Sequence, residues 1–344
     1  MRELRHALYA LLLPAWLLAG TVASAALPTV DDKAGCQRIT TAAGPYSLFL
    51  LPGSTRLLIS THDRRHFEKT GEIQEYDTAS GQLHTLPRRG EPAGLQFRPH
   101  HLDMQQKNGE TLLWIVNHDE DSPNSPQHSL LVYALQSDAL KGDILVFRRR
   151  IRDALLSSPN HVSVAPDGDV YVSNDRRNGN SWLELALRQS KANVVHWREG
   201  EPWEVVADEL AFPNGVKAES TRVLVALSFG NALLVYPRHA DGKLGTPRKA
   251  FSLPALDGIT PGPESGIYLL ASHGPLLDFL RHKHDSRHPA SGIIQALNPD
   301  TGSQQIVFND DGQRISALTS AVMSGSSLYI GQAFDNFILR CPLH

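Results

Sequence analysis

The sequence lacks a Gly-x-Ser-x-Gly motif and contains only two cysteines, Cys36 and Cys341, among its 344 residues. The missing motif argues against a serine nucleophile on a strand-to-helix turn, and pairing of the two cysteines would exclude a cysteine nucleophile. Any hydrolysis would therefore depend on activated water. The total of 33 lysines and arginines nearly matches the 36 aspartates and glutamates, which implies neither nucleic acid nor an acidic membrane surface as a partner.

The chain also lacks a Pro/Gly/Ser-rich linker and any low-complexity tract, which favours one domain. Its N-terminus has basic residues, an apolar run and small residues suited to cleavage: Arg2, Arg5 and His6, then residues 7–18, then Ala23-Ser24-Ala25. This order predicts a signal peptide over residues 1–25, a mature domain over residues 26–344 and a periplasmic or secreted protein. The alternative is an uncleaved anchor, although the apolar run is short for a membrane span.

What the sequence does contain is a repeated pair of strands. The stronger strand of each pair is rich in β-branched or aliphatic residues: residues 57–60, 111–117, 170–174, 222–228, 267–272 and 327–332. A second strand follows each one: residues 72–76, 130–133, 193–197, 232–236, 292–297 and 336–341. Six such cycles predict an all-β, six-bladed β-propeller. A flat β-sandwich is the alternative, but sandwiches rarely repeat so regularly.

The two cysteines lie near the two ends of this repeat. The ends of the chain meet in a closed ring, because the last blade is usually completed by an N-terminal strand. A disulfide between Cys36 and Cys341 would lock that closure and stabilise the fold by about 5 kcal/mol in the loop-entropy model. Two free buried thiols are the alternative, which an oxidising compartment disfavours.

A polar residue recurs at the start of three repeats. It is Asn160 in Pro159-Asn160-His161, Asn214 in Pro213-Asn214-Gly215 and Asp257 in Leu256-Asp257-Gly258. Blades stacked around an axis would direct these side chains into one shared space, and oxygen ligands from separate blades could form a calcium site there. The alternative is that all three cap turns where blades begin, as asparagine and aspartate often do.

Ordered motifs extend this pattern over nearly the whole mature chain. They are Phe97-Arg98-Pro99-His100, Trp114-Ile115-Val116-Asn117-His118, Pro159-Asn160-His161 with Ser173-Asn174-Asp175, Phe212-Pro213-Asn214-Gly215, Leu256-Asp257-Gly258 with Ser272-His273, and the terminal Cys341. In this order and spacing, the chain resembles the paraoxonase/arylesterase family of calcium-dependent propellers, which is related to gluconolactonases and strictosidine synthases.

The resemblance implies a role for several of these residues. Asn160, Asn214 and Asp257 would hold a catalytic calcium that polarises the carbonyl of an ester or lactone. His100 matches the general base for the attacking water, and His118 matches a second histidine that orients and assists it. Each also has a structural alternative as a satisfied buried histidine. The remaining pocket residues would be Tyr46, Asn174, Asp175, His273 and Thr319.

The chain departs from the family's metal ligands. The family's acidic pair on the first short strand corresponds to Tyr46 and Ser47 here, a further ligand asparagine corresponds to Gly258, and an acidic ligand of the structural calcium corresponds to His161. Calcium affinity falls steeply as anionic ligands are lost, so we expect the structural calcium to be absent. For the catalytic calcium three outcomes stay open: a weak site completed by water and Tyr46, a different metal using His161, or a metal-free pocket.

These observations predict an exported hydrolase of small lactones or aryl esters. The alternative is a propeller that lost the calcium chemistry and now binds a ligand or a partner protein, and the replacement at Tyr46 favours this second function. A condensation like that of strictosidine synthase is a third possibility, against which the pair His100 and His118 argues. The histidine-rich segment 281–288 is expected to be a solvated loop at the rim. The sequence identifies neither the substrate nor the oligomeric state.

Overall fold

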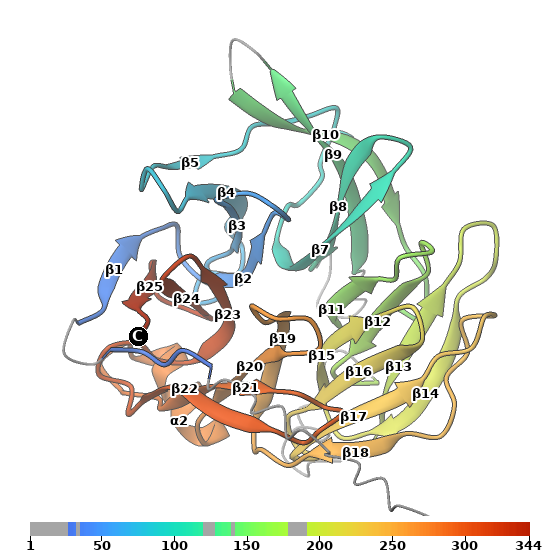
Figure 1. Ribbon diagram of the computed structural model, residues 1–344. Helices are drawn as coiled ribbons and strands as arrows, with labels where there is room; N and C mark the ends of the chain where they lie inside the picture. The colour runs from blue at the N-terminus through green and yellow to red at the C-terminus, as the bar shows by residue number, and fades with distance from the viewer. Residues whose placement is uncertain (1–26, 32–34, 120–127, 139–141, 178–190) are drawn as a thin grey trace, which may run out of the picture.

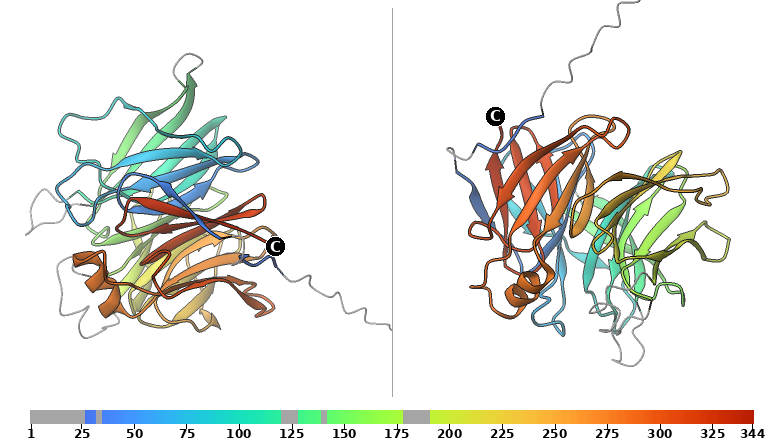
Figure 2. Two further views of the ribbon diagram at one scale, coloured as in Figure 1. Left: turned by 90° about the vertical axis from the view of Figure 1, so that its left-hand side faces the viewer. Right: turned by 90° about the horizontal axis from the view of Figure 1, so that it is seen from below.

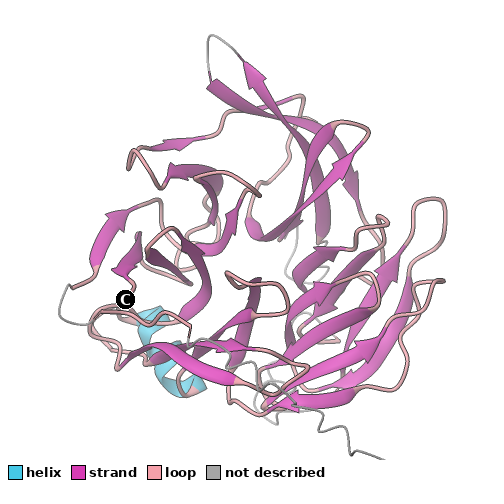
Figure 3. Cartoon of the chain, viewed as in Figure 1, coloured by secondary structure: helices cyan, strands magenta, loops and turns pink. Residues whose placement is uncertain are grey.

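Six sheets surround a central axis in this protein (Figure 1). The computed structural model describes residues 27–31, 35–119, 128–138, 142–177 and 191–344. Within these ranges nearly all regular structure is β-strand (Figure 3). The predicted all-β, six-bladed propeller is therefore confirmed, and the flat sandwich is not the fold. The predicted signal peptide falls on residues 1–25, which lie outside the described ranges.

Four sheets are four-stranded meanders in which each strand pairs with the next along the chain. They contain β2 (Pro45–Leu50), β3 (Arg56–Thr61), β4 (Glu72–Asp77) and β5 (Leu83–Thr85); β11 (Pro159–Val164), β12 (Val170–Asn174), β13 (Ala192–Trp197) and β14 (Glu204–Leu210); β15 (Pro213–Ala218), β16 (Arg222–Leu227), β17 (Ala232–Pro237) and β18 (Arg248–Phe251); and β19 (Leu256–Pro261), β20 (Tyr268–His273), β21 (Gly292–Leu297) and β22 (Gln304–Asp310).

A fifth sheet has an additional strand at its outer edge. Its meander consists of β7 (Pro99–Lys107), β8 (Glu110–Asn117), β9 (Ser129–Asp138) and β10 (Gly142–Ile151). The two-residue strand β6 (Arg88–Arg89) pairs in parallel with β10. All twelve strands predicted from the repeat coincide with observed strands to within a few residues. Their β-branched and aliphatic side chains are buried, as are Val170 and Val172 of β12.

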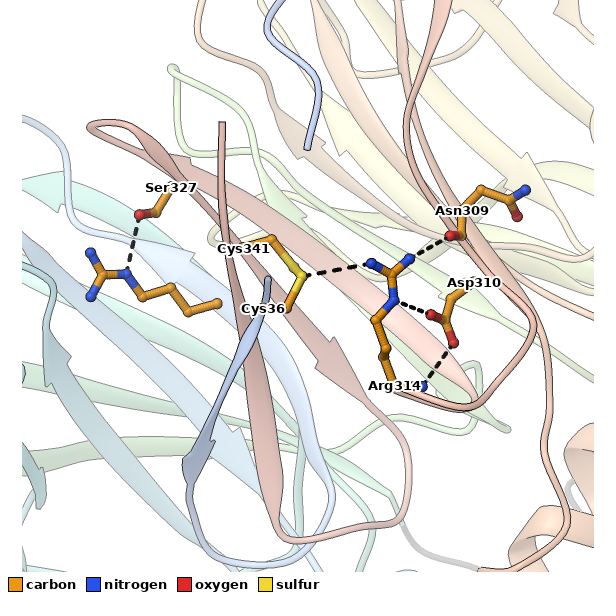
Figure 4. The surroundings of a disulfide bond; sticks show 7 residues. Cys36, Asn309, Asp310, Arg314, Ser327 and Cys341 are labelled. Carbon is orange, nitrogen blue, oxygen red and sulfur yellow. Dashed lines mark hydrogen bonds and ion pairs between the residues drawn. A yellow bond between two sulfur atoms is a disulfide. The ribbon is translucent and has the colours of Figure 1, made fainter. Parts of the chain in front are cut away.

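The sixth sheet closes the ring with strands from both ends of the chain. It contains β23 (Leu318–Ser324), β24 (Ser327–Gln332), β25 (Phe337–Pro342) and the N-terminal strand β1 (Gln37–Thr40). β1 runs antiparallel to β25, and the predicted disulfide joins Cys36, the residue before β1, to Cys341 in β25 (Figure 4). The guanidinium of Arg314 lies beside this disulfide and is ion-paired with Asp310.

The six innermost strands share one local feature that positions the site. In β2, β7, β11, β15, β19 and β23 the pairing register with the next strand shifts at or just after the second residue. Such a bulge re-aims the side chain that it contains. The second residues of these strands are Tyr46, His100, Asn160, Asn214, Asp257 and Thr319. One position of the repeat therefore supplies a residue from every blade.

One helix, α2 (Leu276–His284), is present within the described ranges (Figure 3). It corrects in part the expectation that segment 281–288 is a solvated rim loop, because residues 281–284 belong to the helix whereas residues 285–288 form a mostly exposed loop. The helix begins after Pro275 and places Leu276, Phe279 and Leu280 at helical spacing. His282 is buried, and its Nε2 lies 3.1 Å from a carboxylate oxygen of Asp335. α2 and the C-terminus lie at opposite ends of the ring axis (Figure 2).

None of the helices in the described ranges combines the length and the hydropathy that crossing a lipid bilayer requires.

Candidate functional site

Three oxygen atoms from three different blades meet at the hydroxyl of Tyr46. This hydroxyl donates a 2.7 Å hydrogen bond to Asp257 Oδ1. It lies 3.2 Å from Asn160 Oδ1 and 3.5 Å from Asn214 Oδ1. The structure thus brings the three residues predicted as metal ligands together, and it places the phenol of the fourth blade against all three oxygens. All four residues are buried.

Neighbouring side chains fix the direction of the two amides. Asn160 Oδ1 lies 2.8 Å from His161 Nδ1, so that ring nitrogen donates to it, and Asn160 Nδ2 donates to Asp175 Oδ2 at 3.3 Å. Asn214 Nδ2 donates to the hydroxyl oxygen of Ser228, also at 3.3 Å. Because the amide nitrogens are used outside the cluster, the two amide oxygens face Tyr46. His161 is committed to this network through its Nδ1.

Arg64, in the loop after β3, supplies the cluster with a positive charge. Its guanidinium carbon lies 4.5 Å from the centre of the Tyr46 ring. Its Nη1 donates to the main-chain oxygens of Gly44, His62 and Ala333 at 3.1, 3.3 and 3.4 Å. Its Nη2 is buried and has no hydrogen-bond partner within the described ranges. A buried donor without a partner is costly, so this atom is a candidate to contact a ligand oxygen.

Burial dominates the titration of the cluster. It raises the pKa of Asp257 to about 7, against the opposing effects of the hydrogen bond from Tyr46 and the charge of Arg64. Burial also raises the pKa of the Tyr46 hydroxyl well above its usual range, and Asp257 adds to this rise. The pKa of Arg64 falls to about 10 because of burial. At neutral pH, Tyr46 is therefore a neutral phenol and Arg64 is a cation.

His100 packs directly on this cluster. Its ring centre is 3.8 Å from that of Tyr46 and 4.6 Å from that of His118. Its Nδ1 lies 3.1 Å from the main-chain oxygen of Asn160, which only accepts hydrogen bonds, so Nδ1 carries the proton and Nε2 the lone pair. Burial holds the pKa of both histidines well below the usual range. His100 is therefore a neutral imidazole whose Nε2 is an acceptor.

His118 is fixed in a different way. Its Nε2 donates to the main-chain oxygen of Pro159 at 2.9 Å. The rings of His100 and His118 are tilted by 39° against each other, which is a packing contact. Among the described residues, each ring is held by a main-chain carbonyl of β11, and no hydrogen bond joins the two.

A cavity of about 210 Å³ opens over the cluster and is called the central cavity below. Its polar lining comes mainly from the innermost strands and includes Tyr46, His100, Asn160, Asn214 and Asp257, together with Arg64, Asp175 and His273. Its apolar lining comes from the loops and α2: Phe212, Phe229, Leu276, Phe279, Leu280 and Phe334. This combination suits a small molecule with one polar end and an apolar or aromatic remainder.

Two of the predicted pocket residues lie behind the cavity. The hydroxyl of Thr319 donates to the main-chain oxygen of Tyr46 at 2.6 Å, so it holds the first strand of the neighbouring blade. The side chain of Asn174 bridges Leu155, Ser158 and Asn193. Neither residue lines the central cavity, and neither does His118. These three are placed to brace the residues that do.

The prediction from sequence missed Arg64 and the apolar lining. Arg64 stands in the loop between β3 and β4, outside the strands that form the repeat, so the strand pattern carries no signal for it. A signal did exist for α2, because Leu276, Phe279, Leu280 and Lys283 recur at helical spacing after a proline. It was hidden by the strongly polar end of the segment.

Gly258 shows why the family's further ligand asparagine is missing. A Cβ atom at this position would lie only 2.3 Å from the main-chain oxygen of Thr319. The innermost strands β19 and β23 approach too closely here for any side chain. The missing ligand is therefore excluded by backbone packing.

The residues at the cluster do not fit calcium. They offer one carboxylate, two amide oxygens and a neutral phenol, whereas calcium takes six to eight oxygens and gains affinity from anionic ones. The charge of Arg64 already acts on the one carboxylate and lowers its pKa against the effect of burial. Among the described residues, no group of three or more histidine, cysteine, aspartate or glutamate side chains could hold a metal ion. Of the three outcomes left open by the sequence, these contacts favour the metal-free pocket.

Comparison with known proteins agrees with the fold. Solved structures that resemble it include a protein assigned as a gluconolactonase (15% identity, TM-score 0.53, covering 90% of this chain and 92% of that one). Others are a luciferin-regenerating enzyme (10%, 0.53, 92% and 95%) and the PQQ-bound aldose sugar dehydrogenase of Streptomyces coelicolor (13%, 0.52, 90% and 98%). At such identities the likeness shows the fold alone. No curated protein matches the chain.

The sequence itself matches a family model. The model is that of arylesterase, and it covers residues 57–343, which include every predicted site residue except Cys36 and Tyr46. Because this match spans most of the chain, it supports a hydrolase-like propeller. The chain belongs to the arylesterase family.

Proposed function

We propose that this protein hydrolyses small lactones or aryl esters by adding water to the carbonyl carbon without a bound metal ion. The observation that carries the proposal is the position of His100. In a chain of the arylesterase family, this neutral imidazole lines the central cavity with its Nδ1 proton on a main-chain oxygen, so its Nε2 carries the lone pair. A neutral imidazole of this kind suits the activation of water.

The chain's own residues account for each proton. His100 Nε2 takes a proton from water as the oxygen bonds to the carbonyl carbon. The negative charge that develops on the carbonyl oxygen is stabilised by Arg64, whose buried Nη2 has no hydrogen-bond partner in the described ranges. The tetrahedral intermediate then breaks its bond to the alkoxide or phenoxide, which receives the proton from His100. An aryl ester gives a phenol and a carboxylic acid, and a lactone gives a single hydroxy acid.

His118 and the cavity lining have supporting roles in this proposal. His118 is a positioning residue, because it packs on His100 while a main-chain oxygen holds its Nε2. Four phenylalanines favour an aromatic or apolar group on the substrate. They are Phe212, Phe229, Phe279 and Phe334.

We also propose that the protein acts outside the cytoplasm as a single mature domain over residues 26–344. The disulfide between Cys36 and Cys341 supports an oxidising compartment. The basic and apolar N-terminal sequence supports export through a signal peptide.

The test is a panel of lactones and aryl esters with wild-type protein and His100→Gln. Loss of a general base lowers kcat by about 100- to 10,000-fold, with circular dichroism unchanged. The matched control is His101→Gln, because His101 is a buried neighbour that packs on His161 and does not line the cavity. The proposal fails if His100→Gln hydrolyses the panel as fast as wild type, or if wild type hydrolyses no member.

A second candidate is a binding protein that has lost hydrolysis. The observation in its favour is that Tyr46, rather than a carboxylate, contacts the three oxygens of the cluster. In that case members of the same panel would raise the melting temperature without being converted.

A further inference from the structure

The Tyr46 hydroxyl makes the contacts that an ion would make in this propeller. It reaches one oxygen from each of three other blades, at 2.7 Å to Asp257, 3.2 Å to Asn160 and 3.5 Å to Asn214. A hydroxyl carries only one hydrogen, and the shortest contact assigns it to Asp257. Three acceptor oxygens that converge on one point suit a cation. In this protein the hydroxyl of Tyr46 occupies that point.

Hydrogen bonds to neighbouring side chains fix the orientation of the Asn160 and Asn214 amides. The nitrogen of Asn160 bonds to Asp175, and the nitrogen of Asn214 bonds to Ser228. His161 donates to the same oxygen of Asn160 that faces Tyr46. The two amide oxygens therefore point at the phenol because of a network, and a rotation of either amide would break bonds outside the cluster.

The Tyr46 hydroxyl carries no charge, and the positive charge beside the cluster comes from Arg64. Its guanidinium lies over the Tyr46 ring at 4.5 Å, and three main-chain carbonyls hold its Nη1 in place. This fixed cation balances the charge of Asp257. It would also repel a divalent cation that entered the cluster.

We propose that the Tyr46 hydroxyl and the Arg64 guanidinium together replace the divalent cation at the centre of this propeller. The hydroxyl donates to Asp257 and occupies the space between the oxygens of three blades, and the guanidinium balances the carboxylate. The chain therefore holds its central site together without calcium. This inference goes beyond the proposed function, because it applies whether or not the protein hydrolyses an ester.

Calcium binding tests the inference directly. Chelator-treated wild-type protein is titrated with calcium chloride by isothermal calorimetry, and its melting temperature is followed in parallel. We expect neither heat of binding nor a shift in melting temperature up to about 1 mM calcium, the range of weak extracellular sites. Saturable binding below that concentration, with a rise in melting temperature, overturns the proposal.

A double variant tests the two replacements. Tyr46→Glu/Arg64→Met adds a carboxylate against the three oxygens and removes the competing charge, so we expect calcium affinity to rise by about 100-fold or more. The matched control Tyr46→Phe/Arg64→Met removes the hydroxyl and the charge without adding a ligand, and it should gain much less. A folded Glu variant that binds calcium no better than wild type contradicts the proposal.

The single variant Tyr46→Phe keeps the inference testable if the double variant does not fold. Its melting temperature should fall several-fold further than that of Tyr236→Phe, a buried tyrosine whose raised pKa is due to burial alone. Equal falls in the two variants would show that the Tyr46 hydroxyl does not link the cluster.

Discussion

At the scale of single residues, one position of the repeat decides the chemistry of the site. The second residue of each innermost strand lies at or beside a bulge, and the bulge sets the direction of its side chain. Different residue types can therefore occupy this position and still point the same way. The recurrence of Asn160, Asn214 and Asp257 in the sequence was sufficient to predict that they meet. The role of Arg64 could not be predicted, because it depends on a loop that only the folded ring brings over Tyr46.

Gly258 gives a prediction at this scale. Gly258→Asn restores the residue that the family has here, but it should lower the free energy of unfolding by about 2–4 kcal/mol, because its Cβ would collide with the carbonyl of Thr319. The measurement is urea denaturation.

Gly302→Asn is the matched control. Gly302 has a φ of +72°, which asparagine tolerates, and no heavy atom lies within 4 Å of a Cβ built there. It should change stability by no more than about 0.5 kcal/mol. Equal stability of the two variants would show that β19 and β23 have room for a side chain at position 258.

At the scale of elements, the strands follow from the sequence more directly than the helix does. Alternating β-branched residues bounded by turns identify each strand of the repeat. The helix α2 is short, and polar residues dominate its last turn. Its stability comes from tertiary contacts instead: Asp335 receives bonds from His282 and from Arg65, and Arg65 also donates to the main-chain oxygens of His282 and Lys283. Such contacts are invisible in a local pattern.

Asp335→Ala should therefore loosen α2 selectively. Removing this carboxylate leaves His282 and Arg65 without a shared partner, so we expect amide hydrogen exchange in residues 276–284 to accelerate by about 10-fold or more, while exchange in the strands changes little. Hydrogen exchange followed by mass spectrometry measures this.

Asp278→Ala is the control, since Asp278 is on the same helix, is partly exposed, and its carboxylate pairs with the exposed Arg281. If both variants exchange at the wild-type rate over α2, the contacts of Asp335 do not hold the helix.

At the scale of the whole molecule, the fold was predictable because both the closure of the ring and the repetition of its blades can be recognised in the sequence. Two cysteines separated by 305 positions can join only if the ends of the chain meet. Six cycles of strands specify the number of blades. What the sequence left open was the state of the centre, since three acceptor oxygens suit either a metal ion or a hydrogen-bond donor.

The closing disulfide gives a prediction at this scale. The double variant Cys36→Ser/Cys341→Ser should lower the free energy of unfolding by up to about 5 kcal/mol, because it releases a very long loop in the unfolded chain. Guanidinium denaturation of the oxidised wild type and of the variant measures the difference. Identical midpoints and slopes would show that the bond does not contribute to closure.

Acid should also destabilise the protein. Burial lowers the pKa of His62 to about 4, of His101 to about 3 and of His128 to about 4. Between pH 6.5 and pH 4 the unfolded chain binds protons at these histidines that the folded chain does not, so each lowers stability by about 1.4 kcal/mol per pH unit. Asp257, with a pKa raised to about 7, acts in the opposite direction in this window.

Burial lowers the pKa of four further histidines, which are His100, His118, His161 and His273. The buried histidines therefore outweigh the one aspartate, and stability should fall on acidification near pH 5. Denaturant midpoints measured from pH 7.5 to pH 4.5 test the sign. Constant or rising stability on acidification would contradict it.

Hydrolysis in the presence of a chelator tests the central claim most directly. Wild-type protein is assayed on its best lactone or aryl ester in EDTA and then in added calcium, with His100→Gln beside it. A site in which Tyr46 and Arg64 replace the cation predicts equal rates in both buffers and a loss of about 100-fold or more in the variant. A rate that disappears in EDTA and returns with calcium would contradict the account.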